Sequence, residues 1–241
     1  MKLTLITATH HRAETLATVA LPSVLSLTNR SAFEWVIVND GRDIPTRKLI
    51  NEFQKLTNLT ITYLEMDHPT CGFGLCHARN MGLLHTSCEI IAYLDDDNTL
   101  KPNFVESILK FFQNNPEIRC SMARQNRRRD IIRDNHPPKH GKPFLSPSAS
   151  TSAYSLIQQK DIFDSNGFAH YRHDAHRWNP NYRVFADYEF FLQCTSLWGE
   201  ARANASKFGA IATKSGFSFF VVDKACIVAR SSKREVITKN C

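Results

Sequence analysis

Hydrophobic and polar positions follow two periodicities over the first 125 residues of this 241-residue chain. Short apolar runs, typical of buried strands, occupy 3–8, 35–40, 59–65 and 89–95. Between them, apolar residues recur at helical spacing over 14–27, 46–56, 75–85 and 102–114. Pro22 predicts an irregularity in the first helix, and Pro102 suits the first turn of the last. This alternation predicts an α/β fold with a mainly parallel sheet flanked by helices.

The pattern is less regular after residue 125. A strand-like segment, SAYSLIQ, covers 152–158, and VFADYEFFLQC predicts a helix over 184–194. Two further strand-like segments, FSFFVVD and CIVAR, cover 217–223 and 226–230. We expect 1–241 to form a single domain in two halves, 1–125 and 126–241.

Composition narrows the class of protein. Hydrophobic residues make up 42% of the chain, which is ordinary for a globular protein. The sequence contains no apolar run long enough to span a membrane, and its N-terminus becomes polar too early for a signal peptide. Seven cysteines without a secretory signal favour reduced thiols and a cytoplasmic location. No CxxC pair occurs, and Cys71 and Cys76 are a weak candidate pair of metal ligands.

The formal charge of +7 is concentrated in one segment. Residues 124–142 contain seven Lys or Arg and two Asp, a net +5 that leaves +2 for the rest of the chain. Such a segment can contact phosphates, nucleic acid or an anionic membrane face, and it is equally consistent with a solvated, mobile loop or a lid.

Three polar clusters follow predicted strands: Thr9-His10-His11, Asp40-Gly41 and Asp95-Asp96-Asp97. In open α/β sheets ligands bind at the carboxyl ends of strands, so these clusters are expected to converge. On an extended chain Asp95 and Asp97 would project to one side, as Mg²⁺ or Mn²⁺ ligands do. The sequence DDDN is also typical of a solvated turn, but its place after a buried strand favours a ligand site.

Two common phosphate-binding motifs are absent from the sequence. The TATHHR stretch after the first predicted strand contains no glycine, and no GK[ST] occurs anywhere. A phosphate-bearing ligand would therefore be held by a metal and by basic side chains, among which Arg79 is a candidate.

Several motifs in order resemble glycosyltransferase family 2, the inverting enzymes with the GT-A fold. LITATHHR is similar to the family's IPTYNR, WVIVNDGRD to VVDDGS, and GLCHARNMGLLHTSCEIIAYLDDDNTLKP to its central block with the Asp-rich DXD metal motif. The resemblance covers roughly residues 2–200. It implies a nucleoside-diphosphate-sugar donor such as a UDP-sugar, a Mn²⁺ or Mg²⁺ cofactor, a nucleotide-sugar-binding half at 1–125 and an acceptor-binding half at 126–241.

The resemblance also implies residue roles. Thr9 and His10 would line the nucleoside pocket, Asp40 would accept a hydrogen bond from the base, and Arg79 would lie by the base or the diphosphate. Asp95 or Asp96 would contact ribose or sugar hydroxyls, and Asp97, with Asp95, would bind the metal. The implied nucleotide-sugar-binding set is Thr9, His10, Arg12, Asp40, Arg79, Asp95 and Asp96.

Asp187 would be the general base that removes the proton of an acceptor hydroxyl. Its position at the start of a predicted helix is equally consistent with an N-cap. Ala186 stands where the family usually has Glu, so Glu189 is an alternative base. The tail CIVARSSKRE lacks the family's metal-binding histidine, which leaves His170, His173 and His176 as candidates by spacing.

The resemblance implies transfer of one hexose to a glycan, a lipid-linked acceptor or a cell-surface polysaccharide precursor, since the Q-x-x-R-W motif of processive synthases is absent. Trp178, Tyr171 and Tyr182 are candidates for stacking on a sugar. Peripheral contact with the inner face of a membrane is expected at 124–142, and no nucleic-acid partner is expected. The alternatives are a sugar-phosphate nucleotidyltransferase and a non-catalytic protein that binds nucleotides, or nucleic acid through Arg127, Arg128 and Arg129.

Overall fold

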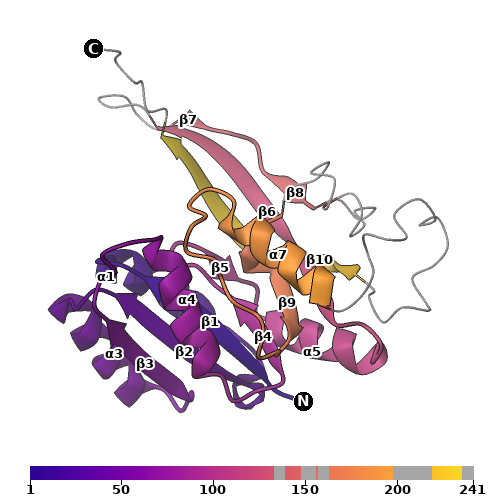
Figure 1. The fold of residues 1–241 in the computed structure, drawn as a ribbon, viewed down its shortest axis with the longest axis horizontal. Coiled ribbons are helices and arrows are strands. Elements are labelled where there is room, and N and C mark those ends of the chain that lie inside the picture. The colour runs from indigo at the N-terminus through magenta and orange to yellow at the C-terminus, as the bar shows by residue number, and fades with distance from the viewer. Residues whose placement is uncertain (133–138, 148–155, 157–162, 198–218, 235–241) are drawn as a thin grey trace.

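The computed structural model describes residues 1–132, 139–147, 156, 163–197 and 219–234 (Figure 1). In these residues ten strands form one sheet. The strands are β1 Leu3–Thr9, β2 Phe33–Asp40, β3 Ile61–Met66, β4 Ile90–Tyr93, β5 Thr99–Leu100, β6 Cys120–Ile132, β7 Lys139–His140, β8 Phe144–Ser146, β9 Phe168–Tyr171 and β10 Phe219–Arg234. The α-helices are α1 Ala13–Thr15, α2 Leu21–Leu25, α3 Ile44–Leu56, α4 Gly74–Leu84, α5 Phe104–Asn114 and α7 Ala186–Leu197.

The sheet order is β3-β2-β1-β4-β9-β6-β10-β5, with β7 and β8 paired to β6. Strands β3, β2, β1 and β4 are parallel, as the alternation of strands and helices predicts. Beyond them β9 runs antiparallel between β4 and β6, and β10 pairs parallel with β6 and antiparallel with β5. The α/β prediction is confirmed, with a parallel first half and a mixed second half.

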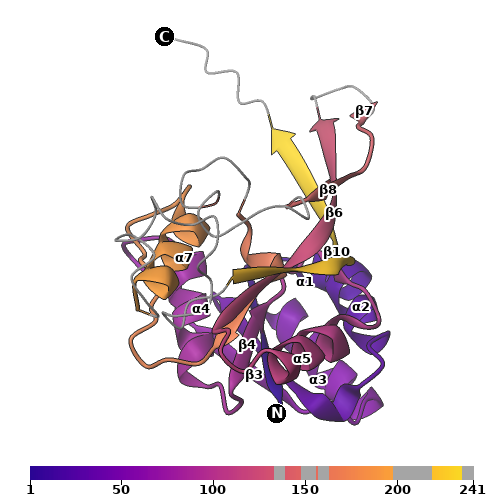
Figure 2. The same cartoon turned by 90° about the vertical axis from the view of Figure 1, so that its right-hand side faces the viewer.

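Each parallel strand sends alternate side chains to opposite faces of the sheet, so the protein has two cores. Leu3, Leu5 and Trp35 belong to the core that α2, α3 and α5 cover, whereas Ile6 and Tyr93 belong to the core beneath α4 and α7. Figure 2 shows α4 and α7 on one side of the sheet and α2, α3 and α5 on the other.

Helix α4 approaches β1 closely because it has a glycine at the contact. A Cβ on Gly82 would lie 2.7 Å from Cγ2 of Ile6, which is too close for any larger residue without movement. This contact fixes the helix that carries Arg79 against the strand that leads to Thr9.

Several predicted boundaries differ from the structure. The helix predicted over 14–27 is interrupted by a π-helical turn, Leu16–Ala20, immediately before α2. Pro22 lacks the N–H that would continue the α-helical hydrogen bonds, and it lies in the first turn after this irregularity. Helix α5 begins at Phe104 after the N-cap Asn103, so Pro102 lies outside its first turn.

The second half is more regular than its sequence suggests. From residue 219 onward, the two strand-like segments in the tail belong to one strand, β10, whose register against β6 shifts between Val222 and Ile227. Residues 124–132 of the basic segment lie in β6, so the prediction of a mobile loop is wrong for that part, while 133–138 lie outside the described residues. The strand-like segment at 152–158 also lies outside them, except for the buried Leu156.

In the described part of the chain, no helix is both long enough and apolar enough to cross a bilayer. The cysteines Cys71, Cys76, Cys88, Cys120 and Cys194 form no disulfide in the described part of the chain.

Candidate active site

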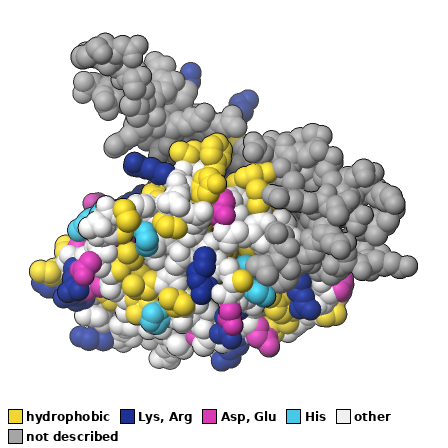
Figure 3. Space-filling view, in the orientation of Figure 1, with side chains coloured by type: hydrophobic (Ala, Val, Ile, Leu, Met, Phe, Trp, Pro, Cys, Tyr) yellow, Lys and Arg dark blue, Asp and Glu magenta, His cyan; other side chains and the backbone are white. Residues whose placement is uncertain are grey.

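A cavity of about 820 Å³ lies at the carboxyl ends of the parallel strands. Of the eight residues predicted for the donor and metal sites, all but Arg79 line it: Thr9, His10, Arg12, Asp40, Asp95, Asp96 and Asp97. The expected convergence of the three polar clusters is therefore present. Figure 3 shows acidic, basic and histidine side chains interspersed over one face of the molecule.

Asp40, the last residue of β2, is buried at the N-terminus of α4. A Cβ on Gly74, the first residue of that helix, would lie 1.9 Å from Oδ2 of Asp40, so the carboxylate packs directly on the glycine. The positive end of the helix dipole favours a negative charge there. Nδ1 of His68 lies 3.0 Å from Oδ1 of Asp40, and Nδ1 of His10 contacts the backbone carbonyl of Asp40. The rings of His10 and His68 are 5.0 Å apart, centroid to centroid.

The chain turns sharply after β1. His11 has a φ of 50°, in the left-handed region that few non-glycine residues adopt. On either side of this turn, His10 contacts Asp40 and Arg12 contacts the acidic cluster. Such strain persists where the surroundings fix the backbone, as is common in binding sites.

The acidic cluster lies in a β-turn rather than on an extended strand. Strand β4 ends at Tyr93, and the amide of Asn98 donates to the carbonyl of Asp95 across 3.1 Å. The premise that Asp95 and Asp97 project to one side of an extended chain is therefore wrong. DDDN forms the turn that its composition favours, and all three carboxylates still line the cavity.

Each carboxylate of the turn has its own partners. Asp96 is buried, accepts a hydrogen bond from the Thr9 hydroxyl across 2.7 Å, and pairs with Arg12 across 2.8 Å. Asp97 pairs with the same guanidinium across 2.9 Å. Burial raises the pKa of Asp96 to about 6, against the opposing effects of Thr9 and Arg12. Arg12 thus offsets much of the repulsion between Asp96 and Asp97.

Asp95 belongs to a second, interior network centred on Arg79. The Arg79 guanidinium donates to Asp95 across 2.8 Å, to Asp187 across 2.7 Å and to the Ser165 hydroxyl across 2.9 Å. Its Cζ lies 4.2 Å from the centroid of the Trp178 ring, within cation–π range. Burial alone would lower the pKa of Arg79, but the two adjacent carboxylates raise it, so the guanidinium stays charged.

The position of Arg79 corrects its expected role. Its side chain is 2% exposed and lies behind the cavity wall rather than in it, so direct contact with a base or a diphosphate is not supported. The buried cation instead holds Asp95 and Asp187 in fixed positions relative to each other.

Asp187 is the second residue of α7, so its predicted role as an N-cap is wrong. Its carboxylate is about one-third exposed and accepts from Arg79. Burial raises the pKa of Asp187, while the charge of Arg79 opposes that effect. The alternative base, Glu189, accepts instead from Gln193 on the same helix.

The sequence interpretation missed several residues of the site. The Asn166 side chain donates to Oδ2 of Asp95 across 2.8 Å and accepts from the Asp95 amide across 2.6 Å. Pro180, Asn181 and Arg183 complete the cavity wall. These residues lie far along the chain from the acidic turn, and no motif connected them to it.

Other candidates lie away from the cavity. Trp178 is fully buried and stacks on Phe190 with centroids 4.2 Å apart, so it cannot stack on a sugar, and Tyr171 packs on Phe112. Tyr182 is 46% exposed. Two of the three candidate aromatics therefore serve packing.

The candidate metal-binding histidines also lie elsewhere. His170 and His176 are fully buried beneath α7 and do not line the cavity. Among the described residues, the groups that bring metal-ligating atoms together are His10-Asp40-His68 and His170-His176-Cys194, and neither includes Cys71 or Cys76.

Comparison with known proteins decides the family. Residues 4–178 match the family described as Glycosyl transferase family 2. This chain belongs to that family. It is thus a member of a glycosyltransferase family, and it has the α/β GT-A fold that the resemblance implied.

The similarity to curated proteins covers part of each. A teichoic acid poly(glycerol phosphate) polymerase of Staphylococcus epidermidis is 31% identical over 113 residues, which are 47% of this chain and 15% of that protein. A chondroitin synthase of Escherichia coli is 27% identical over 108 residues, 45% of this chain and 15% of that protein. This chain thus matches a small part of each relative's length.

Solved structures share the fold. S. aureus TarS 1-349 superposes with a TM-score of 0.69 at 14% identity, covering 95% of this chain and 60% of that one. Its complex with UDP-GlcNAc gives 0.66 at 14% identity, with coverage of 100% and 62%. The mannosyltransferase PcManGT of Pyrobaculum calidifontis, in complex with GDP-Man and Mn²⁺, gives 0.55 at 13% identity, with coverage of 95% and 56%.

The buried network predicts that Arg79→Met destabilises the fold by about 3 kcal/mol, because it leaves Asp95 and Asp187 without their cation. Urea unfolding followed by circular dichroism measures this change. Replacing Asp187 by Asn in the same chain should recover part of the loss, since one uncompensated charge is removed.

Arg42→Met is the control, because Arg42 pairs with Asp67 at the surface, where the two side chains are 66% and 79% exposed. Its effect should be small by comparison. Equal losses in the two variants would show that the interior network does not stabilise the fold.

Proposed function

We propose that this glycosyltransferase moves one sugar, with inversion, from a nucleoside-diphosphate-sugar to an acceptor hydroxyl, with Asp187 as general base and a divalent cation at the acidic turn. The observation that carries the proposal is that the donor cavity and the proposed base are held next to each other. The cavity brings Asp40 to the acidic turn, and Arg79 links that turn to Asp187.

The cavity suits a nucleotide sugar in size and polarity. Its volume of about 820 Å³ lies in the usual range for small-molecule sites. Asp40 offers a buried acceptor for a base N–H, and His10 lies beside it with about half of its side chain exposed. Related structures hold UDP, UDP-GlcNAc and GDP-Man, which supports a nucleotide-sugar donor. We favour a UDP-sugar because the complexes with UDP and UDP-GlcNAc superpose with TM-scores of 0.68 and 0.66, against 0.55 for the GDP-Man complex.

The residues at the acidic turn fit a hard divalent cation such as Mn²⁺ or Mg²⁺, which prefers oxygen ligands. Asp97 is the better ligand. Its pair with Arg12 involves Oδ2, and its side chain is 37% exposed, so Oδ1 can face a cation. Asp95 is the second ligand, although Arg79 and Asn166 already contact its two oxygens. A bound cation would offset the negative charge that develops on the departing diphosphate.

Arg12 has a complementary role at the same wall. It pairs with Asp96 and Asp97 at the cavity surface, and its own side chain is 45% exposed. A diphosphate would compete with these carboxylates for the guanidinium. Thr9 acts on the ligand through Asp96, to which its hydroxyl donates.

Asp187 supplies the proton acceptor for the reaction. An acceptor hydroxyl becomes a competent nucleophile when a carboxylate within hydrogen-bond reach takes its proton. Arg79 fixes the Asp187 carboxylate relative to Asp95 and leaves about one-third of its side chain accessible. A single displacement by the activated hydroxyl at the anomeric carbon inverts its configuration.

The acceptor side is proposed to come from 126–241. Pro180, Asn181 and Arg183 line the cavity, and the exposed Tyr182 lies between them in the chain. The names of the curated relatives, a teichoic acid polymerase and a chondroitin synthase, support a glycan or cell-surface polysaccharide precursor as acceptor. A lipid-linked acceptor stays a prediction. The cytoplasmic location and the membrane contact at 124–142 stay predictions.

Neither alternative explains the site as well. Family membership favours glycosyl transfer over nucleotidyl transfer. The nucleic-acid alternative relies on arginines of 127–129, yet Arg127 pairs with Asp164 across 3.2 Å and is largely buried.

Asp187→Asn is predicted to lower the rate of transfer by about 10²- to 10⁴-fold, the usual contribution of a general base. Donor binding should survive, because the substitution is isosteric and lies outside the cavity lining. Release of nucleoside diphosphate measures transfer, and thermal stabilisation by a panel of nucleotide sugars with Mn²⁺ measures binding. Glu189→Gln is the matched control and should retain activity. Unchanged transfer by Asp187→Asn would remove Asp187 as the base.

Gly74→Ala is predicted to weaken nucleotide binding at least about tenfold, because the added methyl group would displace the Asp40 carboxylate. Displacing this buried carboxylate should also lower the melting temperature, so affinity is compared at a temperature where the variant is folded. Calorimetric titration with nucleoside diphosphates measures the affinity. Leu84→Ala, at the exposed far end of α4, is the control. Unaltered affinity in Gly74→Ala would show that Asp40 does not contact the nucleotide.

A further inference from the structure

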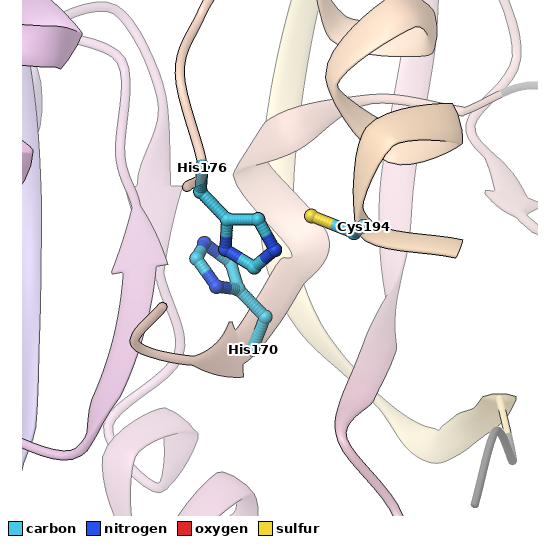
Figure 4. Close-up of side chains that lie close together, drawn as sticks. All are labelled: His170, His176 and Cys194. Atoms are coloured by element: carbon cyan, nitrogen blue, oxygen red, sulfur yellow. The ribbon is translucent and has the colours of Figure 1, made fainter. Parts of the chain in front are cut away.

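A second cluster of side chains that can bind a metal lies in the core beneath α7, away from the cavity. It consists of His170 on β9, His176 on the following loop and Cys194 on α7 (Figure 4). Their ligand atoms all lie within 4.8 Å of one another, and all three side chains are fully buried. Figure 4 shows the Cys194 sulfur directed toward the two imidazoles.

The two imidazoles are suited to bind a metal in their neutral form. Burial lowers the pKa of His170 to about 4 and that of His176 to about 2, so both rings are uncharged at neutral pH. Nδ1 of His170 lies 2.8 Å from the carbonyl oxygen of Tyr171, the kind of contact that orients a metal-bound imidazole. Nε2 of His170 contacts the Tyr93 hydroxyl across 3.0 Å and would exchange that partner for a metal.

Cys120, on the strand next to β9, can supply a fourth ligand. Cys120 of β6 is the register partner of His170, so the two side chains lie next to each other on the same face of the sheet. Cys120 is also fully buried, and it belongs to the same core cluster as Cys194. The pKa of the Cys194 thiol is raised well above its usual value by burial and by the nearby Cys120. Cys120 lies outside the 4.8 Å group and would move toward it on metal binding.

We propose that His170, His176, Cys194 and Cys120 bind one Zn²⁺ ion as a closed structural site. Two cysteines and two histidines form a ligand set typical of structural zinc, which is tetrahedral and leaves no open position. Full burial of all four residues agrees with that closed geometry. The two thiols bind as thiolates, and their two protons pass to solvent.

The ion would join four elements next to the active site: β6, β9, the loop after β9, and α7. His176 lies on the loop that continues to the cavity-lining residues Pro180, Asn181 and Arg183. Asp187 lies about two helical turns before Cys194 on α7. The zinc would therefore fix both the cavity wall and the proposed base, with no part in the chemistry.

The metal content of tag-free full-length protein, purified under reducing conditions, tests the proposal directly. About one equivalent of zinc per chain is expected by mass spectrometry, and Asp97→Asn should retain it, because Asp97 belongs to the other site. After removal of the zinc by a chelator, the melting temperature should fall and should recover with added Zn²⁺.

Substitution with Co²⁺ separates this site from the acidic turn. Thiolate ligands give cobalt an ultraviolet charge-transfer band that an all-oxygen site lacks. The band should be present in wild type and in Cys88→Ser, a buried control thiol, weakened in Cys120→Ser and lost in Cys194→Ser. A wild-type protein that takes up no stoichiometric zinc and gives no such band would overturn the proposal, whatever the fate of the variants or of the glycosyltransferase reaction.

Discussion

The geometry of the active site depends on one buried cation. The Arg79 guanidinium, 2% exposed, binds Asp95 from the acidic turn, Asp187 from α7 and Ser165 from the turn before β9. These three elements are distant in sequence. Apolar packing is non-directional, so it would not by itself place the polar side chains of the three elements within hydrogen-bond distance of one another. A buried arginine with two carboxylates is stable because a planar fork of donors satisfies both acceptors at once. The result is a fixed relation between the proposed metal ligand and the proposed base.

A second guanidinium, that of Arg12, offsets the repulsion among the carboxylates of the acidic turn. Three adjacent carboxylates at a strand end repel one another, and the structure divides them between two cations, with Asp95 on Arg79 and Asp96 and Asp97 on Arg12. Arg79 is sealed in the interior, whereas Arg12 is partly exposed at the cavity and can change partners. The buried pair of Arg79 and Asp95 thus fixes the geometry of the site. A charged ligand can rearrange the partly exposed pairs that Arg12 forms with the other two carboxylates.

Much of the frame could be predicted from the sequence, because strand periodicity is a local signal. The parallel strands and the polar residues at their ends are encoded within short windows, and the topology of parallel sheets then brings Thr9, Asp40 and Asp95 to one edge. The second half could not be predicted as well. Its strands pair antiparallel with distant partners, and β9 enters the sheet beside β4 without any sequence signal.

Side-chain roles that depend on burial were the hardest to predict. Arg79 and Trp178 stand in motifs that suggest ligand contact, yet each packs against the other in the interior. Similarly, the histidines of the second half suggested a third ligand for the donor metal, but β9 and the following loop carry them beneath α7, next to cysteines that no spacing rule connects to them. A sequence shows which residues can bind, and the fold decides where they point.

The central claim is that the acidic turn and Asp40 together form a metal-dependent donor site. Calorimetric titration of a nucleoside diphosphate into wild type and Asp97→Asn, with Mn²⁺ and then with a chelator, tests it most directly. The account predicts that wild type binds far more tightly with Mn²⁺, and that Asp97→Asn loses most of this difference while its melting temperature is maintained. Equal affinity in Mn²⁺ and in chelator for wild type, or a metal effect unchanged in Asp97→Asn, would contradict it.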